Sequence, residues 1–216
     1  MTANGYHFLR VNMSIALKIT ASIALMTASM APALAVMEAQ LNITGNVTPV
    51  SCNLGPDVNT PTTLSLGNAA PGDFQHGGGS PLYVHLYTVP GSLRTFAVTV
   101  NGCSGMTLIK GGELKVKINA YGRIMGTNSD KLFGGGHGQK SNAGVTLAAR
   151  NSPSLSGHKV LLGDGDEVVA YVYREGEMSD AANGSTVLFD TMMASIGQRP
   201  RAGGIDAPIT FTVDYQ

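Results

Sequence analysis

Apolar and polar residues alternate along the last stretch of the chain. In FTVDYQ (211–216), apolar side chains occupy every second position and polar side chains stand between them. A period of two is typical of a strand that buries one face. The pattern therefore predicts a β-strand that runs to the C-terminus, which is unusual because chain ends tend to fray. The residues that define this strand are Phe211, Val213, Tyr215 and Gln216.

The same alternation appears near the other end, in VMEAQLNITGNV (36–47). One parity of this stretch is apolar or small, and the other parity is polar. It is also predicted to be a half-buried strand. The residues on its apolar side are Met37, Ala39, Leu41, Ile43, Gly45 and Val47.

Short strand-like stretches separated by turn signals fill the rest of the chain, and no segment keeps a helical spacing. The turn signals include PGD (71–73), FGGGHG (133–138) and GDGD (163–166). Many short strands at regular intervals predict an all-β fold, a β-sandwich. Further strands are expected at 62–66, 82–88, 94–101, 113–121, 144–149, 167–174 and 186–192.

Residues 13–35 have the organisation of a secretory signal peptide. Lys18 precedes an apolar run (19–30), and the sequence ALA at 33–35 has the small-x-small form of a cleavage site. Cleavage there would leave a mature chain that begins with the alternating strand. A membrane anchor is the alternative, although the run is shorter than the about 20 residues that span a bilayer. Residues 1–35 are thus assigned to a leader, with Met13 as an alternative start.

The composition limits the functions open to the chain. Only 13% of the residues are charged, compared with about 25% in average globular domains, and the formal net charge is +0. Nucleic acid is not an expected partner, because its binding requires a basic surface. Low charge together with 28 glycines favours an extracellular β-protein over a cytosolic enzyme.

Export also affects the interpretation of the two cysteines, Cys52 and Cys103. In an oxidising compartment such a pair favours a disulfide. The bond would close a loop of about 50 residues and stabilise the fold by about 4 kcal/mol. A catalytic cysteine is the alternative, but no histidine lies close to either residue in the sequence.

Three features in order along the chain resemble the subunits of chaperone–usher pili, and in particular type 1 pilins. First, the signal peptide is followed by an alternating stretch that leads into GNVTPVSC (45–52). Second, a cysteine closes the strand-like stretch FAVTVNGC (96–103). Third, the chain ends in FTVDYQ, with a penultimate tyrosine and with Gly203 upstream. The resemblance covers 36–103 and 203–216.

This resemblance implies an immunoglobulin-like β-sandwich that lacks its last strand. The sandwich domain would span 46–216 and the donor-strand extension 36–45. In such subunits a periplasmic chaperone first lends a strand to an apolar groove, and an outer-membrane usher then assists its replacement by a neighbouring subunit's extension. Backbone hydrogen bonds supply affinity, and alternate side chains fill pockets.

The resemblance also implies roles, partners and a location. The extension would fill the groove of the next subunit in a homo- or hetero-polymer, and the C-terminal strand would form the groove's edge. The pilus would stand on the surface of a Gram-negative bacterium, with a host surface receptor as a further partner. The donor residues would be Met37, Ala39, Leu41, Ile43 and Gly45, and the acceptor residues Phe211, Val213, Tyr215 and Gln216.

Two other interpretations stay open. Both terminal strands would pair within one closed sandwich in a self-complete secreted lectin or ligand-binding module. An enzyme is poorly supported, because GGGHGQKS (134–141) departs from the phosphate-loop spacing and GDGDE (163–167) lacks a full calcium loop. No cofactor, metal or catalytic residue is therefore expected. The histidines, which lack zinc-binding spacing, are His76, His85, His137 and His158.

Overall fold

The computed structural model describes most of the chain beyond its N-terminal segment. The chain divides into two compact units, Met1–Leu34 and Ala35–Gln216, and all described residues belong to the second unit. Among them, no helix has the length and apolar character needed to cross a membrane. The predicted domain boundaries remain predictions. The described residues are 37–45, 52–55, 62–77, 80–104, 112–120, 131–137 and 139–215.

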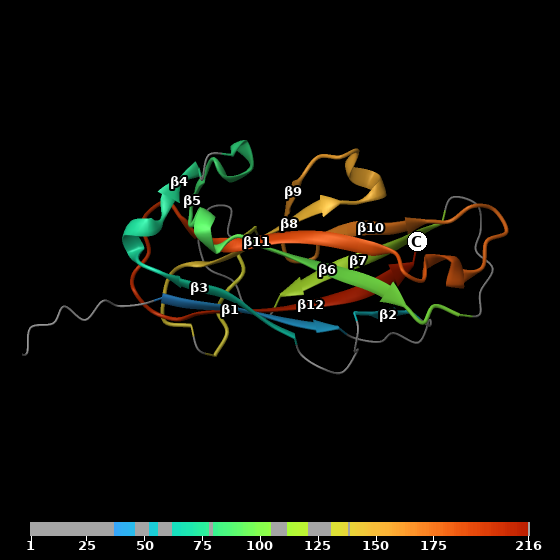
Figure 1. Cartoon of the computed structure of the whole chain (residues 1–216), viewed down its shortest axis with the longest axis horizontal. Coiled ribbons are helices and arrows are strands. Elements are labelled where there is room, and N and C mark those ends of the chain that lie inside the picture. The colour runs from blue at the N-terminus through green and yellow to red at the C-terminus, as the bar shows by residue number, and fades with distance from the viewer. Residues whose placement is uncertain are drawn as a thin grey trace, which may run out of the picture. The chain divides into compact units, whose positions relative to one another are not determined.

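The second unit is built from two β-sheets (Figure 1). One sheet has five strands in the order β10-β7-β12-β1-β3. The terminal strands β1 and β12 are therefore neighbours in its interior. The bounds of these strands are Glu167–Val172 for β10, Glu113–Ala120 for β7, Ile205–Tyr215 for β12, Met37–Gly45 for β1 and Thr62–Ala69 for β3.

The other sheet is centred on the long strand β11. It follows the order β2-β6-β11-β5-β4, and β8 pairs with β11 while β9 pairs with β8. The bounds are Asn53–Leu54 for β2, Gln75–His76 for β4, Leu86–Thr88 for β5, Arg94–Asn101 for β6, Gly144–Asn151 for β8, Val160–Leu162 for β9 and Thr186–Ile196 for β11. The short 3-10 turns are η1 (Pro71–Asp73), η3 (Pro81–Tyr83), η4 (Pro90–Ser92), η6 (Pro153–Leu155) and η7 (Ser179–Ala182).

Aromatic side chains from both sheets meet in the core. The ring of Phe211 on β12 lies 5.1 Å from that of Phe189 on β11, and Phe96 on β6 lies 5.5 Å from Phe189. On β12 the side chains at 205, 207, 209, 211 and 213 are buried, whereas the residues between them are partly exposed. The alternation seen in the sequence therefore marks the core face, and the predicted all-β, immunoglobulin-like sandwich is confirmed.

The predicted disulfide between Cys52 and Cys103 is present. Cys52 lies directly before β2 and Cys103 follows β6. The bond therefore links the ends of two strands that pair with each other in the second sheet. Both cysteines are buried. A structural disulfide also excludes a catalytic thiol at either position and indicates an oxidising, extracytoplasmic environment.

The outer face of the second sheet carries a smaller core, which the sequence did not reveal. Its buried members include Tyr83, Leu132 and Met192. Burial, and after it the negative charge of Asp190, raises the pKa of Tyr83 to about 12. This extra layer explains why β8 is buried on both faces from Gly144 to Ala149.

The strand predicted at 82–88 is wrong in its first half. Pro81 begins the 3-10 turn η3, and the hydroxyl of Ser80 caps it by accepting a hydrogen bond from the backbone N–H of Leu82 at 3.3 Å. Proline has no N–H to give to a sheet and fixes its own φ, so it favours such a turn. Only Leu86–Thr88 remain as strand β5.

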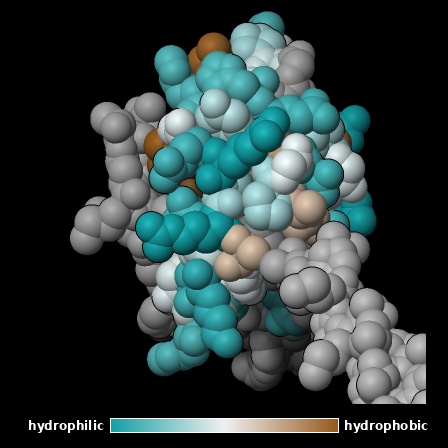
Figure 2. Space-filling view, turned by 90° about the vertical axis from the view of Figure 1, so that its left-hand side faces the viewer, coloured by the Kyte–Doolittle hydropathy of each residue, from teal (hydrophilic) through white to brown (hydrophobic). Residues whose placement is uncertain are grey.

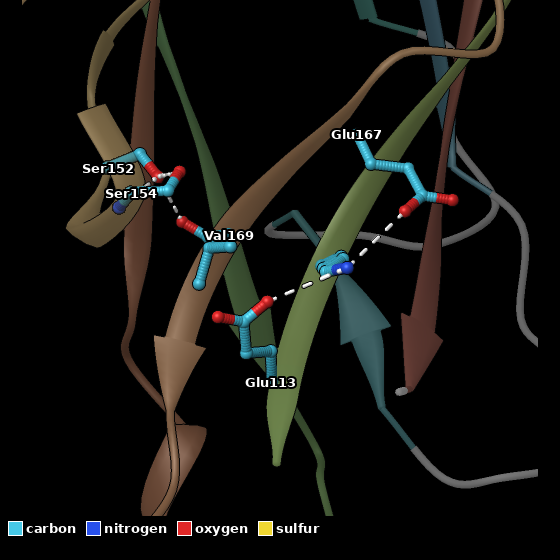
Figure 3. A network of polar contacts seen from close by, with 6 residues as sticks. Glu113, Ser152, Ser154, Glu167 and Val169 are labelled. Carbon is cyan, nitrogen blue, oxygen red and sulfur yellow. Dashed lines mark hydrogen bonds and ion pairs between the residues drawn. The ribbon is translucent and has the colours of Figure 1, made fainter. Parts of the chain in front are cut away.

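The turn η6 contacts β10, the edge strand of the five-stranded sheet (Figure 3). It follows β8 of the second sheet, and the hydroxyl of Ser152 donates to the backbone oxygen of Val169 on β10 at 2.7 Å. On the outer face of the same edge, Lys115 lies 3.6 Å from Glu113 and 3.7 Å from Glu167. These contacts attach the edge strand β10 to its surroundings.

Candidate functional site

The candidate site is the position that β1 occupies between β12 and β3 (Figure 1). Strand β1 runs parallel to β12, from the pair Ala39–Ile205 to the pair Gly45–Phe211. It runs antiparallel to β3, with a register shift between Ala39 and Gln40. The N-terminal strand therefore contributes backbone pairing to neighbours on both of its sides.

Of the three β1 residues whose burial is described, two have side chains in the core. Ala39 and Leu41 are fully buried, whereas Gln40 between them is exposed. Leu41 stands opposite Ala207 of β12 on one side and Leu64 of β3 on the other. Burying a leucine side chain contributes about 1.5–3 kcal/mol, so this residue is a main anchor of the strand.

The other predicted donor residues lie on the same strand. By backbone register, Met37 pairs with Ala69 of β3, Ile43 with Ile209 of β12, and Gly45 with Phe211 of β12. The side chains of Met37 and Ile43 lie outside the described part of the structure. The donor role assigned to all five residues remains a prediction.

Strand β12 pairs with β1 and turns alternate side chains into the core. Phe211 and Val213 are buried, Tyr215 is partly buried, and Gln216 lies outside the described residues. On its opposite edge β12 pairs with β7, from Ile209–Ala120 to Tyr215–Leu114. Strand β12 is therefore held from the β7 side independently of β1 along its second half.

The end of β12 is tied to the disulfide. The hydroxyl of Tyr215 contacts the Sγ atom of Cys52. Burial raises the pKa of Tyr215 above its ordinary value of 10.0, so the phenol stays protonated under ordinary conditions. This contact explains how a strand so close to the C-terminus keeps its place in the sheet.

The start of β12 is held by the glycine-rich loop that superficially resembles a phosphate loop. The backbone N–H of Gly136 donates to the oxygen of Asp206 at 3.0 Å, and the N–H of Asp206 donates to the side-chain oxygen of Gln139 at 2.8 Å. The N–H of Lys140 donates to the oxygen of Gly204 at 3.0 Å. The glycine-rich loop (133–141) therefore holds the first part of β12 in place by hydrogen bonds. Local sequence patterns do not reveal this role.

The acidic turn at 163–167 is also structural. Asp164 accepts a hydrogen bond from the backbone N–H of Ala120 at 2.9 Å. Asp166 accepts from the N–H of Gly163 at 2.8 Å and pairs with Lys131 at 2.6 Å. Within the described ranges, no group of three or more histidine, cysteine or acidic side chains is placed to hold a metal ion.

No family model matches the chain, and no curated protein matches it. The resemblance to pilus subunits therefore rests on the sequence features described above.

Proposed function

We propose that the chain is a structural subunit of an adhesive surface pilus, polymerised by donor-strand exchange and serving cell adhesion. The observation that carries this proposal is the position of β1. It is the first described strand of the chain, yet it lies inside a sheet between β12 and β3. Without β1, that sheet would have a gap.

The gap has the properties of a strand-binding groove. Its edges would be the backbone of β12 from Ile205 to Phe211 and the backbone of β3. Its floor would include the side chains of Ile205, Ala207 and Ile209, which are buried when β1 is present. Unpaired edges of this kind bind extended segments by backbone pairing, with alternate side chains filling pockets.

A second copy of the chain carries a suitable occupant. Its β1 has the same sequence, so it can offer the same buried Ala39 and Leu41 to the groove. Exchange of identical elements between copies replaces each contact with an equivalent one. When every copy donates to the next and accepts from the previous one, the interface is head-to-tail, and it gives a linear fibre if the rotation between copies does not close a ring.

The proposed partners follow from the same groove. Before assembly, a periplasmic chaperone would cover it and an outer-membrane usher would assist the exchange, as the resemblance implies. The oxidising environment indicated by the disulfide agrees with passage through the periplasm to a surface pilus.

A second candidate function is favoured by the same strand. Because β1 pairs with β12 and β3 of its own chain, a monomer can form a closed sandwich. A self-complete secreted module that binds a ligand would need no exchange. The two candidates differ in whether β1 leaves its own groove.

Assembly experiments on the exported, oxidised protein distinguish them. The monomer is concentrated and warmed mildly, and strand-linked oligomers are detected by electrophoresis without boiling. A pilus subunit forms a ladder, and added chain that starts at residue 46 shortens the ladder because it accepts a strand but donates none.

Matched variants locate the donor residue in the same assay. Leu41→Asp places a charge on the buried side of β1, and Gln40→Asp places one on the exposed side. Only Leu41→Asp is expected to abolish the ladder. A protein that stays monomeric under all conditions contradicts the proposal and supports the closed module.

A further inference from the structure

A pocket of about 510 Å³ lies where η1 and η4 approach the end of β3, beside the part of β3 that pairs with the first half of β1. Its apolar part is formed by Leu66, Val89 and Pro90. Figure 2 views the end of the domain at which β4 lies in Figure 1, and this end is mainly hydrophilic. The pocket thus combines a polar rim with a small apolar part, in which Pro90 is exposed and Leu66 and Val89 are buried.

Local backbone features shape the pocket. Opposite the register shift between Ala39 and Gln40, Leu66 is the extra residue of β3, and Gly67 has a φ of 80°. This bulge turns the following residues of β3 toward η1. On the other side, the hydroxyl of Ser92 donates to the backbone oxygen of Val89 at 2.7 Å and accepts from the N–H of Met193 at 3.0 Å, which fixes η4 on the sheet.

Four polar side chains line the pocket and have hydrogen-bonding capacity to spare. Arg94 is oriented by two bonds from Nη1, to the backbone oxygens of Leu93 at 2.8 Å and Gly91 at 3.3 Å. Asp73 uses one carboxylate oxygen to accept from the N–H of Ala70 at 2.7 Å. The remaining donors of Arg94 and the other oxygen of Asp73 have no partner in the described part of the chain. The same is true of the side-chain amides of Asn68 and Gln75, and all four residues are exposed to solvent.

The chemical groups of these four side chains indicate which class of ligand would fit. The guanidinium offers donors, the carboxylate offers acceptors, and each amide offers both. Within the described residues, Arg94 and Asp73 do not pair with each other, so both charges are available to a ligand while their sum is zero. A neutral molecule with many hydroxyl groups satisfies such a set, whereas a strongly charged ligand would meet one repulsive group.

We propose that this pocket binds a neutral saccharide, with the apolar floor under the sugar ring and Arg94, Asp73, Asn68 and Gln75 around its hydroxyls. The volume falls within the about 300–1,000 Å³ typical of small-molecule sites and fits a mono- or disaccharide. The site goes beyond the proposed polymerisation. Its lining residues belong to the strands and turns that follow β1, and three of them lie on the part of β3 that pairs with β1 in the monomer.

The test is a calorimetric titration of the exported, oxidised monomer with a named panel: mannose, galactose, glucose, N-acetylglucosamine, lactose and maltose. At least one sugar is expected to bind. Arg94→Gln should weaken that binding about tenfold or more, because it removes charge-assisted hydrogen bonds. Gln75→Ala changes an exposed side chain that makes no hydrogen bond or ion pair within the described residues, so it should weaken binding without affecting folding. Arg174→Gln, at an exposed position outside the pocket, is the matched control and should bind normally.

Either of two results overturns the proposal. One is that no sugar in the panel binds at millimolar concentration. The other is that a sugar binds but Arg94→Gln and Gln75→Ala do not weaken binding more than the control. Because the monomer is used, failure here leaves the assembly assay unaffected, and failure of assembly leaves this titration unaffected.

Discussion

Leu41 of β1 lies directly opposite Ala207 of β12, and both side chains are fully buried. A large side chain thus stands beside a small one on the core face of the sheet. The pairing places the N-terminal strand in the interior of the fold, where cavity formation is costly. It also joins the two terminal segments whose alternation first suggested a relationship between them.

Truncation of this anchor should destabilise the domain strongly. Leu41→Ala is expected to lower the free energy of unfolding by about 2–5 kcal/mol, because it leaves a cavity in the core. The exposed neighbour provides the control, and Gln40→Ala should lower the free energy of unfolding clearly less, because it opens no cavity in the core. Urea unfolding followed by circular dichroism measures both. Equal effects of the two substitutions would show that β1 does not sit in the core.

A buried carboxylate on β11 should make stability sensitive to acid. The side chain of Asp190 is 2% exposed, and it accepts hydrogen bonds from Lys159 at 2.5 Å and Thr95 at 2.6 Å. Burial alone would raise its pKa, but these hydrogen bonds and the positive charges of Lys159 and Arg150 lower it below 3.8. The carboxylate is therefore more acidic in the folded than in the unfolded chain.

The sign of the pH effect follows from this difference. The stabilisation is fully present above the unfolded pKa of about 4 and is lost as the pH falls through the lower, folded pKa. Asp190→Asn should flatten the dependence of the melting temperature on pH in the acid range. Lys159→Met should cost roughly 1–3 kcal/mol at neutral pH, because it leaves the buried carboxylate less well paired. The exposed Lys140→Met is the control, and an unchanged acid profile in Asp190→Asn would contradict this account.

The close contact between the glycine-rich loop (133–141) and the chain before β12 predicts that position 203 must be glycine. A Cβ atom at this position would lie 2.9 Å from the backbone carbon of Lys140 and 2.9 Å from the backbone nitrogen of Ser141. Gly203→Ala should therefore destabilise the domain by about 1–3 kcal/mol through overpacking. At Gly72 a Cβ atom would meet nothing within 4 Å, so Gly72→Ala is the matched control. Thermal unfolding of both variants tests this close contact. Similar melting temperatures of the two variants would contradict it.

Local patterns predicted the terminal strands and the disulfide well. The period of two identified the buried face of β12, and it agrees with the burial of Ala39 and Leu41 on β1. It works because one face of such a strand meets the core and the other meets solvent. It did not identify the partner or the direction of either strand, because the same alternation suits any neighbour. The parallel pairing of Ala39 with Ile205 therefore could not be predicted from the sequence.

The central region was harder to predict for a different reason. Strand β8 is buried on both faces, since residues such as Tyr83 and Leu132 cover the outer side of the second sheet. The strand itself was predicted at 144–149, but the covering of its second face was not, because a strand covered on both faces shows no alternation. The pocket beside η4 was also invisible, because Asn68 and Arg94 are far apart in sequence and meet only through the fold.

The most direct test of the central claim adds the strand back as a separate molecule. The oxidised chain that starts at residue 46 is unfolded thermally with and without a peptide spanning 36–47. The account predicts that the peptide raises the melting temperature by roughly 10 °C or more, since several kcal/mol of burial is restored at about 2–4 °C per kcal/mol, and that it dissociates slowly. A truncated domain that is already stable and does not respond to the peptide would show that no groove awaits a strand, and the polymerisation proposal would fall.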